Sequence, residues 1–255
     1  MKKIFFILSL QCFVVSVFAW GQTGHRVVAQ IAQNHLSDNA AKQIFEIMGH
    51  ESLVEASTWM DNIKSDSTYD HTHAWHYVTI PNGETYESSE KSDKGDAYEA
   101  ILRMKMAIKD ANSTMEEKRD AIRMLTHLIG DVHQPLHVGN GKDRGGNSIK
   151  IKWFYESSNL HRIWDSGMID SKVFSYSELA KLLDHPHEST AVNYTSKDLD
   201  LWVKEAMALR PQVYDFSDIE NLSYEYMYKN WDTTKQQLLK GGLRLAEVLN
   251  ELFES

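Results

Sequence analysis

The segment from His127 to His137, which reads HLIGDVHQPLH, concentrates side chains that can bind a metal ion. His127 and Asp131 are four residues apart, so on a helix they share one face, one turn apart. An imidazole and a carboxylate presented in this way can bind one cation. Pro135 ends the helix, and His137 then follows on irregular chain, where it could serve a second metal ion. The alternative is a helix that carries a few surface histidines.

Two further clusters contain the same residue types. His161 and Asp165 are again four residues apart, and a second such pair argues against coincidence. Asp61 lies among apolar neighbours in WMDNI, where an unpaired buried carboxylate would be costly, and His76 follows in HAWHY. The alternative for Asp61 is an exposed position on a helix. Nitrogen and oxygen ligands without a thiolate suit zinc.

Residues 1–19 have the pattern of a secretory signal peptide. Lys2 and Lys3 precede an apolar run over 4–15, and Val17-Phe18-Ala19 predicts cleavage after Ala19. The alternative is a membrane anchor, but the apolar run is short for a span and polar sequence follows it. After cleavage the chain begins with Trp20, whose free amine is a metal donor once deprotonated. His25 lies close behind it.

Cleavage also changes the composition. The only cysteine, Cys12, lies in the leader, so the mature chain would have no disulfides in an oxidising compartment. Removal of Lys2 and Lys3 takes the formal charge from −9 to −11. A protein this acidic does not hold nucleic acid by a broad basic surface. Binding of phosphates would need a local source of positive charge.

The remaining sequence predicts an all-α protein, with residues 20–255 as one domain. Prolines are few, and apolar residues recur at helical spacing. Helices are predicted over 27–36, 97–108, 114–132, 175–183, 198–213 and 224–253, the last with Gly241-Gly242 as the place where it could break. Residues 82–96 are polar and predict an exposed loop. Only 148–155 alternates like a strand, which predicts a short β-hairpin.

The chain resembles a known family over its length from Trp20 to the last helix. The N-terminal Trp is combined with W-x-D, W-H-Y, T-H-x-x-G-D-x-H-Q-P-L-H, G-G-N and N-L-H-x-x-W-D-x-G. This combination is similar to that of the secreted trinuclear-zinc, single-strand-specific nucleases of fungi, plants and bacteria. That family shares its fold with bacterial zinc-dependent phospholipases C.

The resemblance implies three zinc ions. The first would be held by Asp61, His76, His127 and Asp131. The second would be held by His137, His161 and Asp165. The third would be held by the amine and carbonyl oxygen of Trp20 with His25, and Asp131 would bridge it to the first. Three Zn²⁺ ions bring six positive charges against three ligand carboxylates, which would supply the local attraction for phosphate.

The resemblance also implies residues that contact substrate or take part in the reaction. A water between the first and third zinc ions would attack the phosphorus, with Asp61, Asp131 and Lys64 as catalytic residues. Lys64 matches a basic position beside the phosphate, and its alternative is a solvated helix lysine. Asn147 would fix its loop or contact substrate. Tyr77 and Tyr155 match positions where aromatic side chains meet a base; the alternative places both in the core.

The expected function is that of a secreted or periplasmic zinc endonuclease. It would cut single-stranded DNA or RNA to 5′-phosphate products and would also act as a 3′-nucleotidase. Nucleic acid and nucleotides would be its substrates, with no stable protein partner and no membrane contact. Two alternatives stay open. One is a phospholipase C, although its second zinc site usually ends in Glu rather than Asp165, and the other is a non-catalytic zinc-binding protein. Other histidines have no ligand role in this scheme: His35, His50, His71, His73, His133, His185 and His187.

Overall fold

The computed structural model describes residues 20–185, 194–216 and 221–254 and is predominantly helical, as predicted. Its longer helices are α1 Gln22–Asn34, α2 Asp38–Met48, α5 Ala97–Lys109, α6 Met115–Val132, α9 Tyr176–Leu183, α11 Leu199–Ala208 and α13 Tyr224–Phe253. Other helical segments are the ten-residue 3₁₀ segment η2 Ser67–His76 and the short segments α3 Leu53–Ala56, α4 Trp59–Asn62, η1 Ile63–Ser65, η3 Pro135–His137, α7 Leu160–Arg162, η4 Ile163–Gly167, α8 Met168–Asp170 and α12 Arg210–Val213. The proposed signal peptide, 1–19, and His187 lie outside the described residues.

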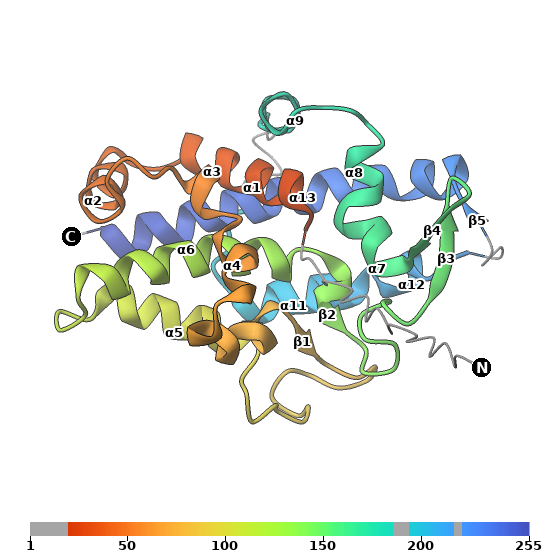
Figure 1. The fold of residues 1–255 in the computed structure, drawn as a ribbon, viewed down its shortest axis with the longest axis horizontal. Helices are drawn as coiled ribbons and strands as arrows, with labels where there is room; N and C mark the ends of the chain where they lie inside the picture. The colour runs from red at the N-terminus through yellow and green to blue at the C-terminus, as the bar shows by residue number, and fades with distance from the viewer. Residues whose placement is uncertain (1–19, 186–193, 217–220, 255) are drawn as a thin grey trace, which may run out of the picture.

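Helix α6 occupies the middle of the molecule, with α1 and α13 along one side and α5 along another (Figure 1). Its N-terminus is the predicted capping box, in which Thr114 accepts from the Glu117 N–H and Glu117 accepts from the Thr114 N–H. Apolar side chains of α1, α2, α5, α6 and α13 form the main core. The last turns of α6 are therefore held on several sides, which fixes the ligand-type residues at its C-terminal end.

The longest helix of the described residues, α13, continues without interruption through Gly241 and Gly242, so the helix does not break at the place where it could. A Cβ added to Gly242 would lie 2.6 Å from Cβ of Ile31 and 3.0 Å from the carbonyl oxygen of Val28. The glycine therefore allows α1 to approach α13 closely rather than ending the helix. The helix predicted over 198–213 is instead divided into α11 and α12, because Pro211 has no N–H to donate to a carbonyl one turn earlier.

Short strands position the chain next to several of the predicted metal ligands. Strand β1 Val78–Thr79 pairs in parallel with β2 Val138–Gly139, which brings the chain after His76 beside the chain after His137. The predicted hairpin is β3 Lys150–Trp153 with β4 Glu156–Asn159, and β5 Asn221–Leu222 adds to β3 in parallel. Residues 82–96 form the irregular connection between β1 and α5. No helix of the described chain is both long and apolar enough to cross a membrane.

Candidate metal centre

Two adjoining groups of buried ligand-type side chains meet at the C-terminal end of α6. His127 and Asp131 project from one face of this helix, with 3.3 Å between His127 Nε2 and Asp131 Oδ2. His25, from α1, completes one group with His127 and Asp131, and Asp61 and His76 form the other with His127. Donor atoms within each group lie within 4.8 Å of one another. The structure thus brings together residues that are more than 100 positions apart in sequence.

Asp131 is the common neighbour of these side chains. Its carboxylate oxygens lie 3.3 Å from His25 Nε2 and 3.1 Å from His76 Nδ1. The His25 and His127 rings stack with centroids 3.8 Å apart. This close approach depends on Gly130, where an added Cβ would lie 2.9 Å from His25 Nδ1.

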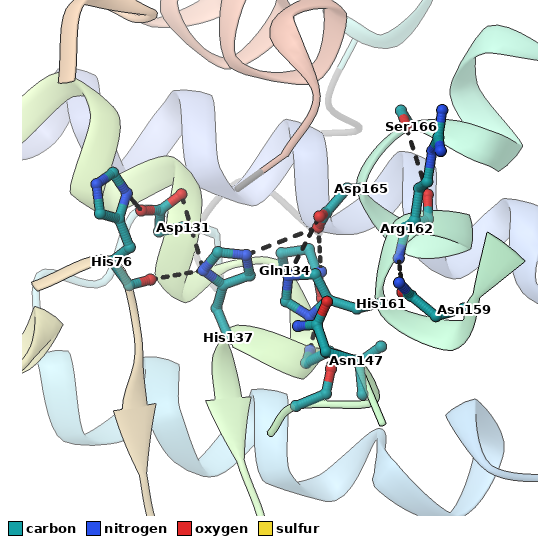
Figure 2. A network of polar contacts seen from close by, with 12 residues as sticks. His76, Asp131, Gln134, His137, Asn147, Asn159, His161, Arg162, Asp165 and Ser166 are labelled. Atoms are coloured by element: carbon teal, nitrogen blue, oxygen red, sulfur yellow. Dashed lines mark hydrogen bonds and ion pairs between the residues drawn. The ribbon is translucent and has the colours of Figure 1, made fainter. Parts of the chain in front are cut away.

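A third group consists of His137, His161 and Asp165. His161 lies on α7, directly after the hairpin, and Asp165 lies on η4, where the helix widens into a π-turn. Asp165 oxygens lie 3.2 Å from His161 Nε2 and 3.6 Å from His137 Nε2. Figure 2 shows His137 between Asp131 and Asp165, so this residue connects the third group to the first two.

Backbone carbonyls fix the orientation of three of these imidazoles. The Nδ1–H groups of His127, His137 and His161 donate to the carbonyl oxygens of Ser57, His76 and Gly145 at 2.7, 2.5 and 2.7 Å, respectively. A proton held on Nδ1 leaves the lone pair of Nε2 directed into the cluster. Metal-binding histidines have this arrangement, because the outer hydrogen bond sets the tautomer and the ring orientation.

The clusters contain buried polar atoms without hydrogen-bond partners in the described part of the chain. These atoms include His76 Nε2, His137 Nε2, His161 Nε2, Asp61 Oδ2 and Asp131 Oδ1. Unpaired buried donors and acceptors normally destabilise a fold, and metal ions would satisfy them. The donors are imidazole nitrogens and carboxylate oxygens, which suit zinc. The residues therefore fit a zinc centre.

Burial and neighbouring charges shift the pKa values of these groups in opposite directions. Burial lowers the pKa of His76 to about 4, which keeps its imidazole neutral. Burial also disfavours charge on His137, but the carboxylates of Asp131 and Asp165 raise its pKa to about 9. Burial would raise the pKa of Asp131, yet His127 and His137 lower it well below its usual value. A second proton, on Nε2 of His137, thus supplies positive charge that stabilises the carboxylates. A bound cation would displace this proton and supply that charge instead, leaving the Nε2 lone pair to bind it.

A cavity of about 430 Å³ opens beside the clusters and is lined by His76, His137 and His161. Lys64 also lines it and donates to Asp61 at 2.5 Å, so it is not a solvated helix lysine. Tyr77 lines the cavity and is half exposed, whereas Tyr155 is 79% exposed in the hairpin turn and does not line it. Neither tyrosine belongs to the core.

Loop residues on the cavity wall include Asn147, whose side chain donates to the Arg144 carbonyl at 3.0 Å. The contact joins two residues of the same loop, and the roles expected of Asn147 stay predictions. His73 also lines the cavity, although no role is predicted for it from its position in the sequence. Histidines at positions 35, 50, 71, 73 and 185 are exposed. His133, the C-cap residue of α6, is buried, and Arg244 donates to its Nε2 at 3.0 Å. Burial and the charge of Arg244 hold the pKa of His133 well below the usual value.

The sequence reasoning missed Gln134, which lies between the second and third histidines of the central motif. Its buried side chain donates to Asp165 Oδ1 at 2.5 Å and accepts from the Leu136 N–H at 2.5 Å. It therefore holds Asp165 in place and starts the 3₁₀ turn that carries His137. The local signal is its position directly before Pro135, which favours the extended backbone that Gln134 adopts ahead of this turn.

Comparison with known proteins provides further evidence for the chemistry of this site. The chain matches the family described as S1/P1 nuclease over residues 20–254. The chain belongs to the S1/P1 nuclease family. Endonuclease 4 of Arabidopsis thaliana is 27% identical, with 98% of this chain and 94% of the relative covered. Nuclease S1 of Aspergillus oryzae is 29% identical (91% of each chain), and nuclease P1 of Penicillium citrinum is 28% identical (92% and 98%).

Membership of the S1/P1 nuclease family makes this protein a nuclease, a hydrolase of phosphodiester bonds. Zinc dependence is typical of that family and agrees with the buried His/Asp groups. The non-catalytic alternative is therefore set aside. The phospholipase alternative also loses support, because these relatives are nucleases by name.

The loop that anchors His161 gives a first prediction. Gly145 has φ +59°, and an added Cβ would lie 2.3 Å from the Leu136 carbonyl oxygen. Gly145→Ala should therefore combine backbone strain with a clash against backbone, and we expect it to lower the free energy of unfolding by at least about 2 kcal/mol. Urea denaturation measures the loss.

The matched control is Gly141→Ala, because Gly141 also has a positive φ, +80°, but its nearest contact would be a Thr79 methyl at 3.4 Å. This variant should lose only about 1 kcal/mol, from strain alone. Equal losses in the two variants would contradict the role given to the contact between Gly145 and Leu136.

Proposed function

We propose that this nuclease is a secreted zinc endonuclease that hydrolyses single-stranded DNA and RNA to 5′-phosphate products and also acts as a 3′-nucleotidase. The observation that carries the proposal is the opening of a cavity directly onto buried His/Asp groups with unpaired donor atoms. An accessible cavity suits a catalytic metal site, whereas a structural zinc site is closed by protein ligands.

We assign three zinc ions to the clusters. Asp61, His76, His127 and Asp131 would bind the first, and His137, His161 and Asp165 the second. Trp20, through its amine and carbonyl oxygen, would bind the third with His25, and Asp131 would bridge the first and third. Proximity of His25, His76 and His127 to the same carboxylate supports the bridge. Bound zinc would lower the pKa of a water nucleophile and stabilise the leaving oxygen.

The protein's own residues would bind and orient the strand. Lys64 lies between the cavity and Asp61, where its ammonium would contact the phosphate while Asp61 holds it in place. Tyr77 offers an exposed ring to an unpaired base, and stacking of this kind requires a base that is free of its complement. Asn147 keeps the loop that carries Gly145, and hence the anchor of His161, in one conformation.

A substrate panel tests the proposed specificity. Purified protein that starts at Trp20 would be assayed on single-stranded DNA, single-stranded RNA, duplex DNA, a 3′-nucleotide and phosphatidylcholine vesicles. We expect cleavage of both single strands to new 5′-phosphate ends, release of phosphate from the 3′-nucleotide, and slow cleavage of the duplex. Duplex cleavage as fast as single-strand cleavage, or hydrolysis of phosphatidylcholine alone, would overturn the proposal.

The tyrosines give a second prediction. Tyr77→Ala should weaken binding of single strands by about 1–3 kcal/mol, the contribution of one stacked base. Cleavage of a small phosphodiester without a base should change little. Tyr155 lies outside the cavity, so Tyr155→Ala should matter only for strands long enough to reach the hairpin. Equal losses on the substrates with and without a base would show that Tyr77 is structural.

A further inference from the structure

The loop between β2 and β3 forms part of the cavity wall and is tightly fixed. Asp143 accepts from the Gly146 N–H at 2.9 Å and from the Tyr214 hydroxyl at 2.8 Å. The Gly145 carbonyl accepts from His161 Nδ1, which connects the loop to the third group of ligand-type residues. The backbone from which side chains of this loop project is therefore fixed relative to the proposed metal centre.

Arg144 has an unusual backbone conformation within this loop. Its φ is +57°, in the left-handed region, and Gly145 and Gly146 after it also have positive φ. A side chain at such a position costs free energy that glycine would avoid. Backbone strain of this kind occurs at binding and catalytic sites, where the surrounding structure imposes it. The strained backbone therefore marks Arg144 as a candidate for contact with substrate.

The Arg144 side chain is exposed and lines the cavity. Within residues 20–185, 194–216 and 221–254 its guanidinium makes no hydrogen bond or ion pair. Lys64 also lines the cavity, but it is held by Asp61 and is assigned to the phosphate at the metal centre. The chain as a whole has a formal charge of −9, so a substrate phosphate outside the metal centre would find little general attraction. A guanidinium with five free donors is well suited to bind one.

We propose that Arg144 binds a phosphate of the substrate strand other than the one that is cleaved. The inference rests on the proposed function, because it takes the scissile phosphate to lie at the His/Asp clusters. Arg144 adjoins the anchor of His161, so its phosphate is the neighbour along the strand on that side of the cavity. The contact would make the site prefer chains with at least two phosphates over substrates with one.

Steady-state kinetics on two substrates tests this assignment. The variants are Arg144→Asn, since asparagine tolerates the left-handed region, and Arg144→Lys, which keeps the charge. The substrates are a single-stranded hexanucleotide and a dinucleoside monophosphate, which has one phosphodiester. Arg144→Asn should raise KM for the hexanucleotide about tenfold, as expected for loss of a charge-assisted contact, and leave the dinucleotide within about twofold. Arg144→Lys should recover part of the hexanucleotide affinity.

Salt dependence gives a readout that a structural role would not move. The slope of log(kcat/KM) against log[salt] for the hexanucleotide should become shallower by about 0.7 in Arg144→Asn, the value for one lost phosphate contact on a single strand. Lys142→Asn is the matched control, because Lys142 is an exposed cation of the same loop that does not line the cavity. Its KM for the hexanucleotide should stay within about twofold of wild type.

Several results would overturn the proposal. These are equal losses on both substrates, no loss on either, an effect of Lys142→Asn as large as that of Arg144→Asn, or loss of zinc from Arg144→Asn. Failure of the proposed function looks different, because wild-type protein would then cleave neither single-stranded substrate.

Discussion

Asp131→Asn should reduce single-strand cleavage more than any other single change at a proposed ligand, by more than about 100-fold. Loss of a residue that only hydrogen-bonds to a metal ligand reduces activity by up to about 100-fold. Asp131 is itself a proposed ligand and lies within 3.3 Å of three imidazoles, so its loss should cost more. The amide has nearly the same shape as the carboxylate, so the core around α6 should keep its packing. Loss of one charge would weaken two proposed zinc sites at once. Elemental analysis should show less zinc at both.

The matched comparison is Asp165→Asn, because Asp165 belongs to one group only, with His137 and His161. It should lose one zinc ion and retain the others. Circular dichroism and unfolding curves of both zinc-free proteins would report any effect on the fold. An Asp131→Asn enzyme with near-normal turnover, or one that loses no more zinc than Asp165→Asn, would contradict the bridging role.

One additional residue ahead of Trp20 should remove most of the activity. Trp20 is completely buried, and the N–H of the next residue, Gly21, donates to the Asp165 carbonyl at 2.7 Å, so the start of the described chain is fixed beside the clusters. A free amine can donate a lone pair to a metal ion, whereas the amide nitrogen of an extended chain cannot. We therefore expect the extended protein to hold about one zinc ion fewer and to be at least about tenfold slower.

The experiment compares a protein that starts at Trp20 with one that has Met or Gly ahead of it. A tag after Ser255 serves as the control, because the C-terminus lies at the end of the molecule away from β2 and α7, the elements next to His137 and His161 (Figure 1). The same chemistry would keep the uncleaved precursor nearly inactive, which would link export to activity. Equal zinc content and equal rates in the two forms would show that the amine is not a ligand.

Sequence spacing predicted the central pairs well, because they are local. His127 and Asp131 share a face of α6, as i,i+4 spacing requires. His161 and Asp165 also meet, although the helix between them widens into a π-turn that spacing did not indicate. The capping box at Thr114 correctly marked the start of α6.

Contacts between segments that are distant in sequence could not be predicted from residue spacing. Gly130 allows His25 to stack on His127, but in sequence it is only a small residue within a helix. Gly242 looked like a helix break, and its role in packing against Ile31 depends on how α1 and α13 cross. The parallel pairing of β1 with β2, which places His76 near His137, joins segments 60 residues apart. Such contacts follow from packing rather than from local pattern.

Zinc content measured together with cleavage tests the central claim most directly. Protein that starts at Trp20 would be analysed for zinc per chain, then depleted by a chelator, assayed on single-stranded DNA, and assayed again after zinc is restored. We predict close to three zinc ions per chain, loss of cleavage on depletion, and recovery on addition of zinc. Metal-free protein that still cleaves single-stranded DNA would contradict the account.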